Sequence, residues 1–158
     1  VEISTSGEFG VNGNDDVQFM FSANKNRDMQ AVQLIASGGE VSRLMLSIKY
    51  LIANKSELPT IIFDEIDTGV SGEIADRMGE IMQNMGKAMQ VITITHLPQI
   101  AARSSQHYLV YKDDTGSQTQ TFIRKLKDEE RVTQLAHMLS GKALTEASLL
   151  NAKELLGY

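Results

Sequence analysis

The sequence contains no cysteine and no tryptophan, and it has only two prolines among its 158 residues. The absence of cysteine excludes disulfide bonds and thiolate metal sites, and it is compatible with the cytosol. No apolar run approaches the roughly 18 residues that a membrane-spanning helix needs. A signal-peptide pattern is also missing. We therefore expect no membrane partner.

The sequence also has no excess of positive charge, because it contains 15 Lys and Arg but 20 Asp and Glu, which gives a net charge of −5. This balance argues against a chain that holds nucleic acid by bulk charge. The densest basic run, Arg124 to Arg131, is interrupted by three acidic residues. A solvated face of mixed charge is the simpler interpretation of that run.

The composition that remains, with 42% hydrophobic and 22% charged residues, is that of an ordinary globular protein. A chain of this length can form one domain with a proper core, and we predict a single domain over residues 1–158. Because the first residue is Val rather than Met, we expect a fragment of a longer protein.

Hydrophobic periodicity and turn residues predict an alternation of strands and helices. The first 16 residues suggest a strand edge and a turn. Expected strands cover 17–24, 60–63 and 90–95, with a hairpin at 107–112 and 119–126; expected helices cover 38–53, a segment from Ser71 to Gly86, a short stretch at Pro98, 129–139 and 145–156. Runs 60–63 and 90–95 are apolar on both faces, which suits buried parallel strands. The order predicts an α/β fold with parallel core strands flanked by helices, plus an antiparallel hairpin.

The helix expected from residue 38 begins in an unusual way. Ser37 and Glu40 have the spacing of a capping box with Ser37 as N-cap. The first two helical positions are then Gly38 and Gly39, and glycine in a helix costs about 0.8–1 kcal/mol relative to alanine.

The two glycines suit an anion site. A helix N-terminus offers free N–H groups and the positive end of the dipole, and without Cβ atoms a phosphate can approach that backbone closely. The Ser37 hydroxyl can donate to a phosphate oxygen, whereas the Glu40 carboxylate would have to turn aside. The alternative is a plain capping box with incidental glycines.

Polar side chains gather where the two expected parallel strands end. Asp64, Glu65 and Asp67 follow the first strand, and Thr95 and His96 follow the second. In open α/β sheets the ligand lies beyond the carboxyl ends of the strands, and Mg²⁺ is held by one or two carboxylates together with phosphate oxygens. Asp64 could therefore hold a magnesium shell and Glu65 could orient or deprotonate a water. Taken alone, the carboxylates could equally cap turns, and a lone histidine is more often structural.

Four longer strings are more specific than these core motifs. They are ASGGEVSRLMLSIKYL, TIIFDEIDTGVSG, VITITHLPQIAARSSQHYLV and LAHMLSG. Together they resemble the RecN family of SMC-like bacterial DNA-repair ATPases, from about Phe19 to the C-terminus. The resemblance implies the C-terminal lobe of an ABC/SMC-type P-loop ATPase head.

The resemblance also implies a role for each matching position. Ser37, Gly38, Gly39 and Glu40 match the signature motif, which contacts the γ-phosphate of ATP bound to the opposite head of a dimer. Asp64 matches the Walker B aspartate, which in the family holds Mg²⁺ through water. Glu65 matches the catalytic glutamate, and His96 matches the switch histidine. Thr68, Gly69, Val70 and Ser71 correspond to the D-loop. Ser71 stands where many ABC proteins have Asp, so no aspartate role carries over, and the role of Arg43 is left open.

A Walker A loop is missing from the sequence. The only Gly-Lys pairs, at 86–87 and 141–142, are each followed by Ala and lack the required upstream glycine. No heptad repeat of a coiled coil is present either. We therefore expect only the C-terminal half of a head, with the Walker A half and the coiled coil elsewhere.

The leading hypothesis is part of an ATPase that uses ATP and Mg²⁺ between two heads to drive double-strand break repair. Its partners would be the N-terminal half of its own head, a second head and DNA, in the bacterial cytoplasm at the nucleoid. The alternatives are a non-catalytic interaction module and the nucleotide-binding domain of an ABC transporter.

Overall fold

The computed structural model describes residues 1–22, 25, 28–34, 38–53, 58–115, 118–141 and 143–158. The chain divides into two compact units, Val1–Lys49 and Tyr50–Tyr158. The boundary falls within helix α1 (Gly38–Ala53), and each unit is described by itself. Among the described helices, none combines the length and the apolar character needed to cross a membrane.

The first unit begins with an exposed antiparallel hairpin of β1 (Glu2–Gly10) and β2 (Gly13–Gln18). A short antiparallel pair follows, β3 (Met20–Phe21) with β4 (Gln30–Ala31), and then a 3₁₀ turn, η1 (Val32–Leu34). The single strand expected over 17–24 is thus divided between β2 and β3, and residues 23–24 lie outside the described part. The helix expected from residue 38 is confirmed as α1.

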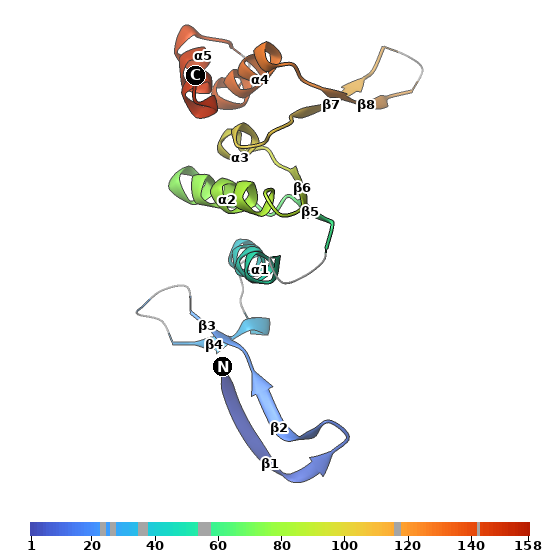
Figure 1. Ribbon diagram of the computed structural model, residues 1–158, viewed down its shortest axis with the longest axis vertical. Coiled ribbons are helices and arrows are strands. Elements are labelled where there is room, and N and C mark those ends of the chain that lie inside the picture. The colour runs from blue at the N-terminus through green and yellow to red at the C-terminus, as the bar shows by residue number, and fades with distance from the viewer. Residues whose placement is uncertain (23–24, 26–27, 35–37, 54–57, 116–117, 142) are drawn as a thin grey trace. The chain divides into compact units, whose positions relative to one another are not determined.

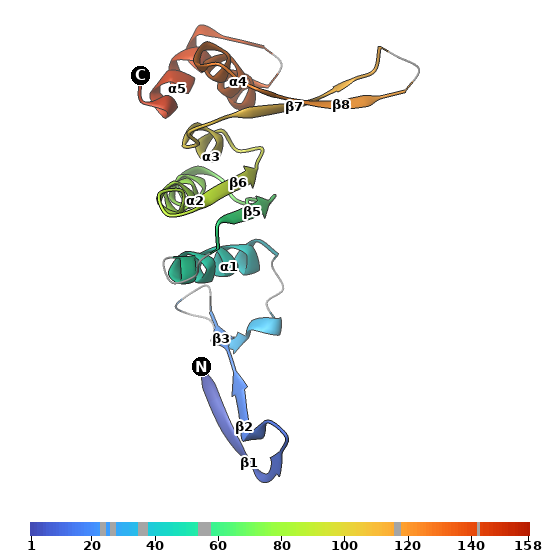
Figure 2. The same cartoon turned by 45° about the vertical axis from the view of Figure 1, so that its right-hand side comes forward.

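The second unit opens with two parallel strands, β5 (Thr60–Asp64) and β6 (Gln90–Ile94), connected by helix α2 (Gly72–Met85). This is a βαβ unit, and α2 lies along the sheet in both ribbon views (Figures 1 and 2). The parallel pairing and the intervening helix are those predicted from the sequence.

Helix α2 covers one face of the β5–β6 sheet. Phe63 on that face is only 6% exposed, and the Thr93 hydroxyl contacts the Met82 sulfur at 3.5 Å. The buried face of α2 consists of Ala75, Met78, Gly79, Met82 and Met85. These residues recur at intervals of three or four positions, which is the spacing of an amphipathic helix.

The opposite face of the sheet is open, which corrects the expectation that both strands are buried. Ile62, Ile92 and Ile94 are 63%, 43% and 52% exposed. Ile62 and Ile92 are direct partners in the strand register, and Ile94 pairs with Asp64. Apolar residues on both faces indicate burial only where both faces are covered, and no described strand or helix of this unit covers this one.

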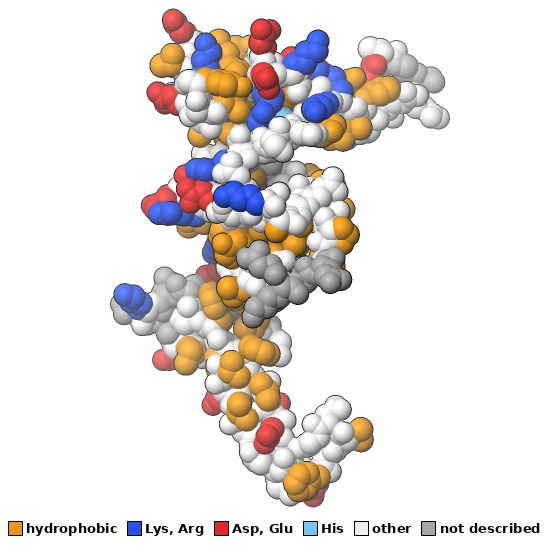
Figure 3. All heavy atoms as spheres, viewed as in Figure 1, with side chains coloured by type: hydrophobic (Ala, Val, Ile, Leu, Met, Phe, Trp, Pro, Cys, Tyr) orange, Lys and Arg blue, Asp and Glu red, His pale blue; other side chains and the backbone are white. Residues whose placement is uncertain are grey.

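The remaining elements follow in the predicted order. They are α3 (Pro98–Ala102), the antiparallel strands β7 (Tyr108–Asp113) and β8 (Gln120–Lys125), α4 (Asp128–Ser140) and α5 (Glu146–Leu156). A second core forms where α3, α4 and α5 meet, around Ala101, Leu135, Ala136 and Ala152. Hydrophobic side chains show at the surface of the β7–β8 hairpin (Figure 3).

The two ends of α2 differ in detail from the sequence prediction. Ser71 occupies the N-cap position, but its side chain makes no capping hydrogen bond. Gly86 ends the helix with a right-handed φ of −61°, so it does not form the left-handed cap in which glycine is common. The chain instead continues through a further turn, in which the Met89 N–H donates to the Met85 carbonyl.

Candidate functional site at the strand ends

The carboxyl ends of β5 and β6 are held together by the ladder that pairs them. Asp64 lies opposite Ile94, and the Glu65 N–H donates to the Ile94 carbonyl at 3.1 Å. His96 follows two residues after Ile94. Two predicted site residues, Glu65 and His96, therefore leave neighbouring strands at the same edge of the sheet.

Glu65 has an unusual backbone conformation. Its φ is +47°, and no other described non-glycine residue has a positive φ. Such a conformation costs on the order of 1–3 kcal/mol and persists only where the surroundings hold it. Thr68 supplies that support, since its hydroxyl and its N–H both donate to the Glu65 carbonyl, at 2.9 and 3.3 Å. The turn points the chain sharply away from the strand directly after Asp64.

The Asp64 carboxylate is suited to a hydrated magnesium ion. It is exposed at the strand end and makes no hydrogen bond or ion pair with the described residues. No group of three His, Cys, Asp or Glu side chains in the described part could hold a metal unaided. Mg²⁺ commonly binds through one or two carboxylates with phosphate oxygens and water completing the shell. The residues present fit that mode, with nucleotide oxygens supplying what the chain lacks.

Asp67 lies at the same edge but is buried. The sequence presents it as a third carboxylate of the cluster, but the structure buries it to 1% exposure. The Thr95 hydroxyl donates to Asp67 Oδ2, and His96 Nδ1 lies 3.9 Å from Asp67 Oδ1. The sequence contained a signal for this link, because Thr95 and Asp67 follow strands that must end side by side.

The four residues matched to the D-loop form the turn into α2. Gly69 has a φ of +72°, which favours glycine, and Val70 is 7% exposed. The Val70 N–H donates to the Asp67 carbonyl at 3.0 Å. Thr68 and Ser71 are exposed. Their role at a dimer interface remains a prediction.

The residues matched to the signature motif belong to the start of α1. Gly38 is exposed, and a Cβ added there would meet no atom within 4 Å. Gly39 and Glu40 are half-buried, while Ser37 lies outside the described residues. Arg43 is half-buried as well, and its carbonyl accepts from the Ser47 hydroxyl at 2.9 Å. Space is thus available at Gly38, and the anion site itself remains a prediction.

Comparison with known proteins gives a consistent relationship. No protein-family model matches the chain. The DNA repair protein RecN of Rickettsia bellii is 46% identical over 99% of the chain, and that of Halalkalibacterium halodurans is 42% identical over 94%. The chain covers 28% and 26% of these two relatives, so it spans little more than a quarter of their length.

Solved structures with a similar fold are heads of SMC proteins. An Smc head domain with a coiled coil and joint from Pyrococcus yayanosii superposes with a TM-score of 0.65 at 19% identity, covering 82% of this chain and 23% of that one. A structure from work on ATP-driven dimerization of SMC ATPases gives 0.57 at 20% identity, covering 75% and 70%. The chain is therefore RecN-like in sequence over nearly its whole length, and it has the fold of an SMC head.

Proposed function

We propose that the chain is the C-terminal part of an ATPase head that binds and hydrolyses ATP between two such heads during DNA double-strand break repair. The observation that carries this proposal is the common edge at which Asp64, Glu65 and His96 leave two paired parallel strands. That edge is where nucleotides bind in open α/β sheets. The names of the relatives support DNA repair as the process.

Each residue at the edge has a task in this proposal. Magnesium would neutralise charge on the nucleotide phosphates, and the exposed Asp64 carboxylate would hold its water shell. Glu65, aimed by its left-handed backbone, would orient the attacking water and accept its proton. His96 would contact the terminal phosphate from β6.

The signature residues would act on a different nucleotide. Ser37, Gly38, Gly39 and Glu40 would meet the γ-phosphate of ATP held by a second head, and the open space at Gly38 supports such an approach. The D-loop residues 68–71 would cross the interface between the heads. In this arrangement one molecule supplies the Walker motifs and its neighbour supplies the signature.

The open face of the β5–β6 sheet supports the expected partner within the same head. Ile62, Ile92 and Ile94 form an exposed apolar row that ends at Asp64. An exposed apolar surface of this kind commonly marks an interaction site. We assign it to the N-terminal half of the head, which would carry the Walker A loop.

The decisive experiment compares ATP hydrolysis by two proteins. The 158-residue chain alone should bind ATP weakly and hydrolyse none, because it lacks a loop to cradle the β-phosphate. A full-length RecN protein carrying this sequence should hydrolyse ATP, and Glu65→Gln should lower its kcat by roughly 10²–10⁴-fold, the range for loss of general-base catalysis.

Glu73→Gln is the matched control, since Glu73 lies exposed in the first turn of α2, outside the proposed site. It should leave kcat unchanged. Steady ATP turnover by the chain alone that Glu65→Gln abolishes would show that catalysis does not need the other half of the head.

A further inference from the structure

Among the described residues, Asp67 is the only ionisable residue that is buried, with 1% of its surface exposed. Removing a carboxylate from water is expensive unless it gains hydrogen bonds or an opposite charge. A buried carboxylate beside a proposed nucleotide site therefore requires a reason.

One oxygen of Asp67 is fully accounted for. The Thr95 hydroxyl accepts a hydrogen bond from the Leu97 N–H at 3.0 Å, so its own proton is free to point to Asp67 Oδ2, to which it donates. Thr95 and Leu97 are the two chain neighbours of His96. The chain on both sides of His96 is thus tied to Asp67 through one hydroxyl.

The other oxygen is unsatisfied. Asp67 Oδ1 is buried and has no hydrogen-bond partner. The cation-forming atom nearest to it is His96 Nδ1 at 3.9 Å, and the His96 side chain is 66% exposed. Hydrogen bonds of this kind span about 2.7–3.2 Å, so a movement of roughly 1 Å by the exposed imidazole would close the contact.

We propose that Asp67 is a positioning residue for His96: Oδ1 accepts the Nδ1–H of the imidazole and so turns Nε2 away from the protein, toward the nucleotide. This deepens the role of His96 in the proposed function and rests on it. Which nitrogen of a histidine meets a ligand is set by the hydrogen bond that the other nitrogen makes. Thr95 contributes by occupying Oδ2, which leaves Oδ1 for the histidine.

A purely structural role for Asp67 would be to hold the turn in place. Its carbonyl accepts from the Val70 N–H, and its Oδ2 accepts from Thr95. Neither contact uses Oδ1. The two roles therefore differ in a single observable, the tautomer of His96.

The test is long-range ¹H–¹⁵N NMR of the histidine rings in the 158-residue chain, recorded without nucleotide at a pH where His96 is neutral. A free imidazole favours the Nε2–H tautomer. We expect His96 to favour Nδ1–H in the wild-type chain. In Asp67→Asn, whose amide can donate to Nδ1, the preference should revert to Nε2–H, whereas the charge-matched control Glu73→Gln should keep Nδ1–H.

Two results would overturn the proposal: an Nε2–H tautomer in the wild-type chain, or an unchanged Nδ1–H tautomer in a folded Asp67→Asn chain. If that variant does not fold, the wild-type tautomer decides, and Thr95→Val provides the second variant. It releases Oδ2 while keeping the carboxylate, so it should weaken the Nδ1–H preference without reversing it.

The outcome is separable from that of the proposed function. The tautomer is measured without ATP and without a second head, so it can be found as expected even if the full-length protein proves to have no ATPase activity. Conversely, Glu65→Gln can abolish hydrolysis while His96 shows no influence of Asp67.

Discussion

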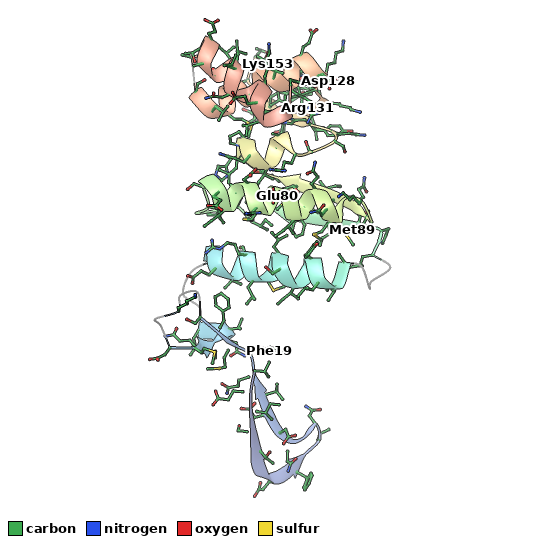
Figure 4. The ribbon with its side chains drawn as sticks, turned by 60° about the vertical axis from the view of Figure 1, so that its left-hand side comes forward. Phe19, Glu80, Met89, Asp128, Arg131 and Lys153 are labelled. Atoms are coloured by element: carbon green, nitrogen blue, oxygen red, sulfur yellow. The ribbon has the colours of Figure 1, made fainter. Side chains whose placement is uncertain are left out.

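Single residues near the start of α4 show how burial changes a proton equilibrium. The Nδ1 atom of His107 is buried without a hydrogen-bond partner, and so is the Nε atom of Arg131. Arg131, whose side chain is 12% exposed, donates to the Ser104 carbonyl at 2.7 Å and lies beside Asp128 (Figure 4). Burial lowers the pKa of His107 below 6.5, and the positive charge of Arg131 lowers it further.

This lowered pKa predicts a pH-dependent stability. Below pH 6.5 the unfolded chain binds a proton at His107 that the folded chain does not yet accept, so the free energy of unfolding falls as the pH decreases through 6.5 toward the folded-state pKa. The loss approaches at most about 1.4 kcal/mol per pH unit. Urea unfolding at pH 7.5 and 5.5 should show a smaller decrease in His107→Gln than in the wild-type chain.

Arg131→Met provides the matching control, because it removes the second cause and leaves the burial. The pKa of His107, followed by NMR, should rise in this variant while staying below 6.5. Equal pH dependence of unfolding in wild type and His107→Gln would contradict the assignment of the effect to this histidine.

At the scale of elements, the β5–β6 sheet has one covered and one open face. Two neighbouring residues of β5 allow each face to be tested: Phe63 lies on the covered face and Ile62 on the open one. Phe63→Ala should lower the free energy of unfolding by about 3–5 kcal/mol, because Phe63 is 6% exposed beneath α2. Ile62→Thr, at a position 63% exposed, should change it by less than about 0.5 kcal/mol. Denaturant unfolding of the two variants measures both, and a similar loss for Ile62→Thr would show that the outer face is covered after all.

The same sheet shows what the sequence could and could not predict. Strand and helix positions were largely predictable because the apolar spacing is local; α1, β6 and the closing helices lie within a residue or two of their expected bounds. The exposure of Ile62 was not predictable, because an apolar strand residue can be covered either by this chain or by another part of the protein. The sequence could place Asp67 and Thr95 at one edge, but it could not predict the burial of Asp67, because burial depends on packing between residues far apart in the chain, such as these two, which are 28 positions apart.

The candidate site also has features that could be predicted from the sequence and features that could not. Its strand-end residues could be placed at one edge from the alternation of elements alone, because parallel strands end together. The positive φ of Glu65 and the support from Thr68 could not be predicted, since a glutamate gives no local signal for a left-handed backbone.

At the scale of the whole molecule, the exposed apolar surface predicts how the chain behaves alone. Besides the isoleucine row of the sheet, the hairpin exposes Tyr108, Val110 and Ile123 to 51%, 60% and 68%. Monomeric proteins rarely expose large contiguous apolar patches, and exposed strand edges tend to pair. We expect the 158-residue chain to self-associate as its concentration rises, measured by sedimentation velocity from micromolar to millimolar concentration.

Charge placed on one surface at a time identifies which of them drives the association. Ile62→Lys combined with Ile92→Lys should shift the chain toward the monomer if the open sheet face is responsible, because burying an unpaired ammonium in a contact is unfavourable. Val110→Lys combined with Ile123→Lys makes the same test of the hairpin, where these two residues lie opposite each other. A wild-type chain that stays monomeric at millimolar concentration would mean that its exposed isoleucines need no partner, and would remove the support they give to a covering N-terminal half.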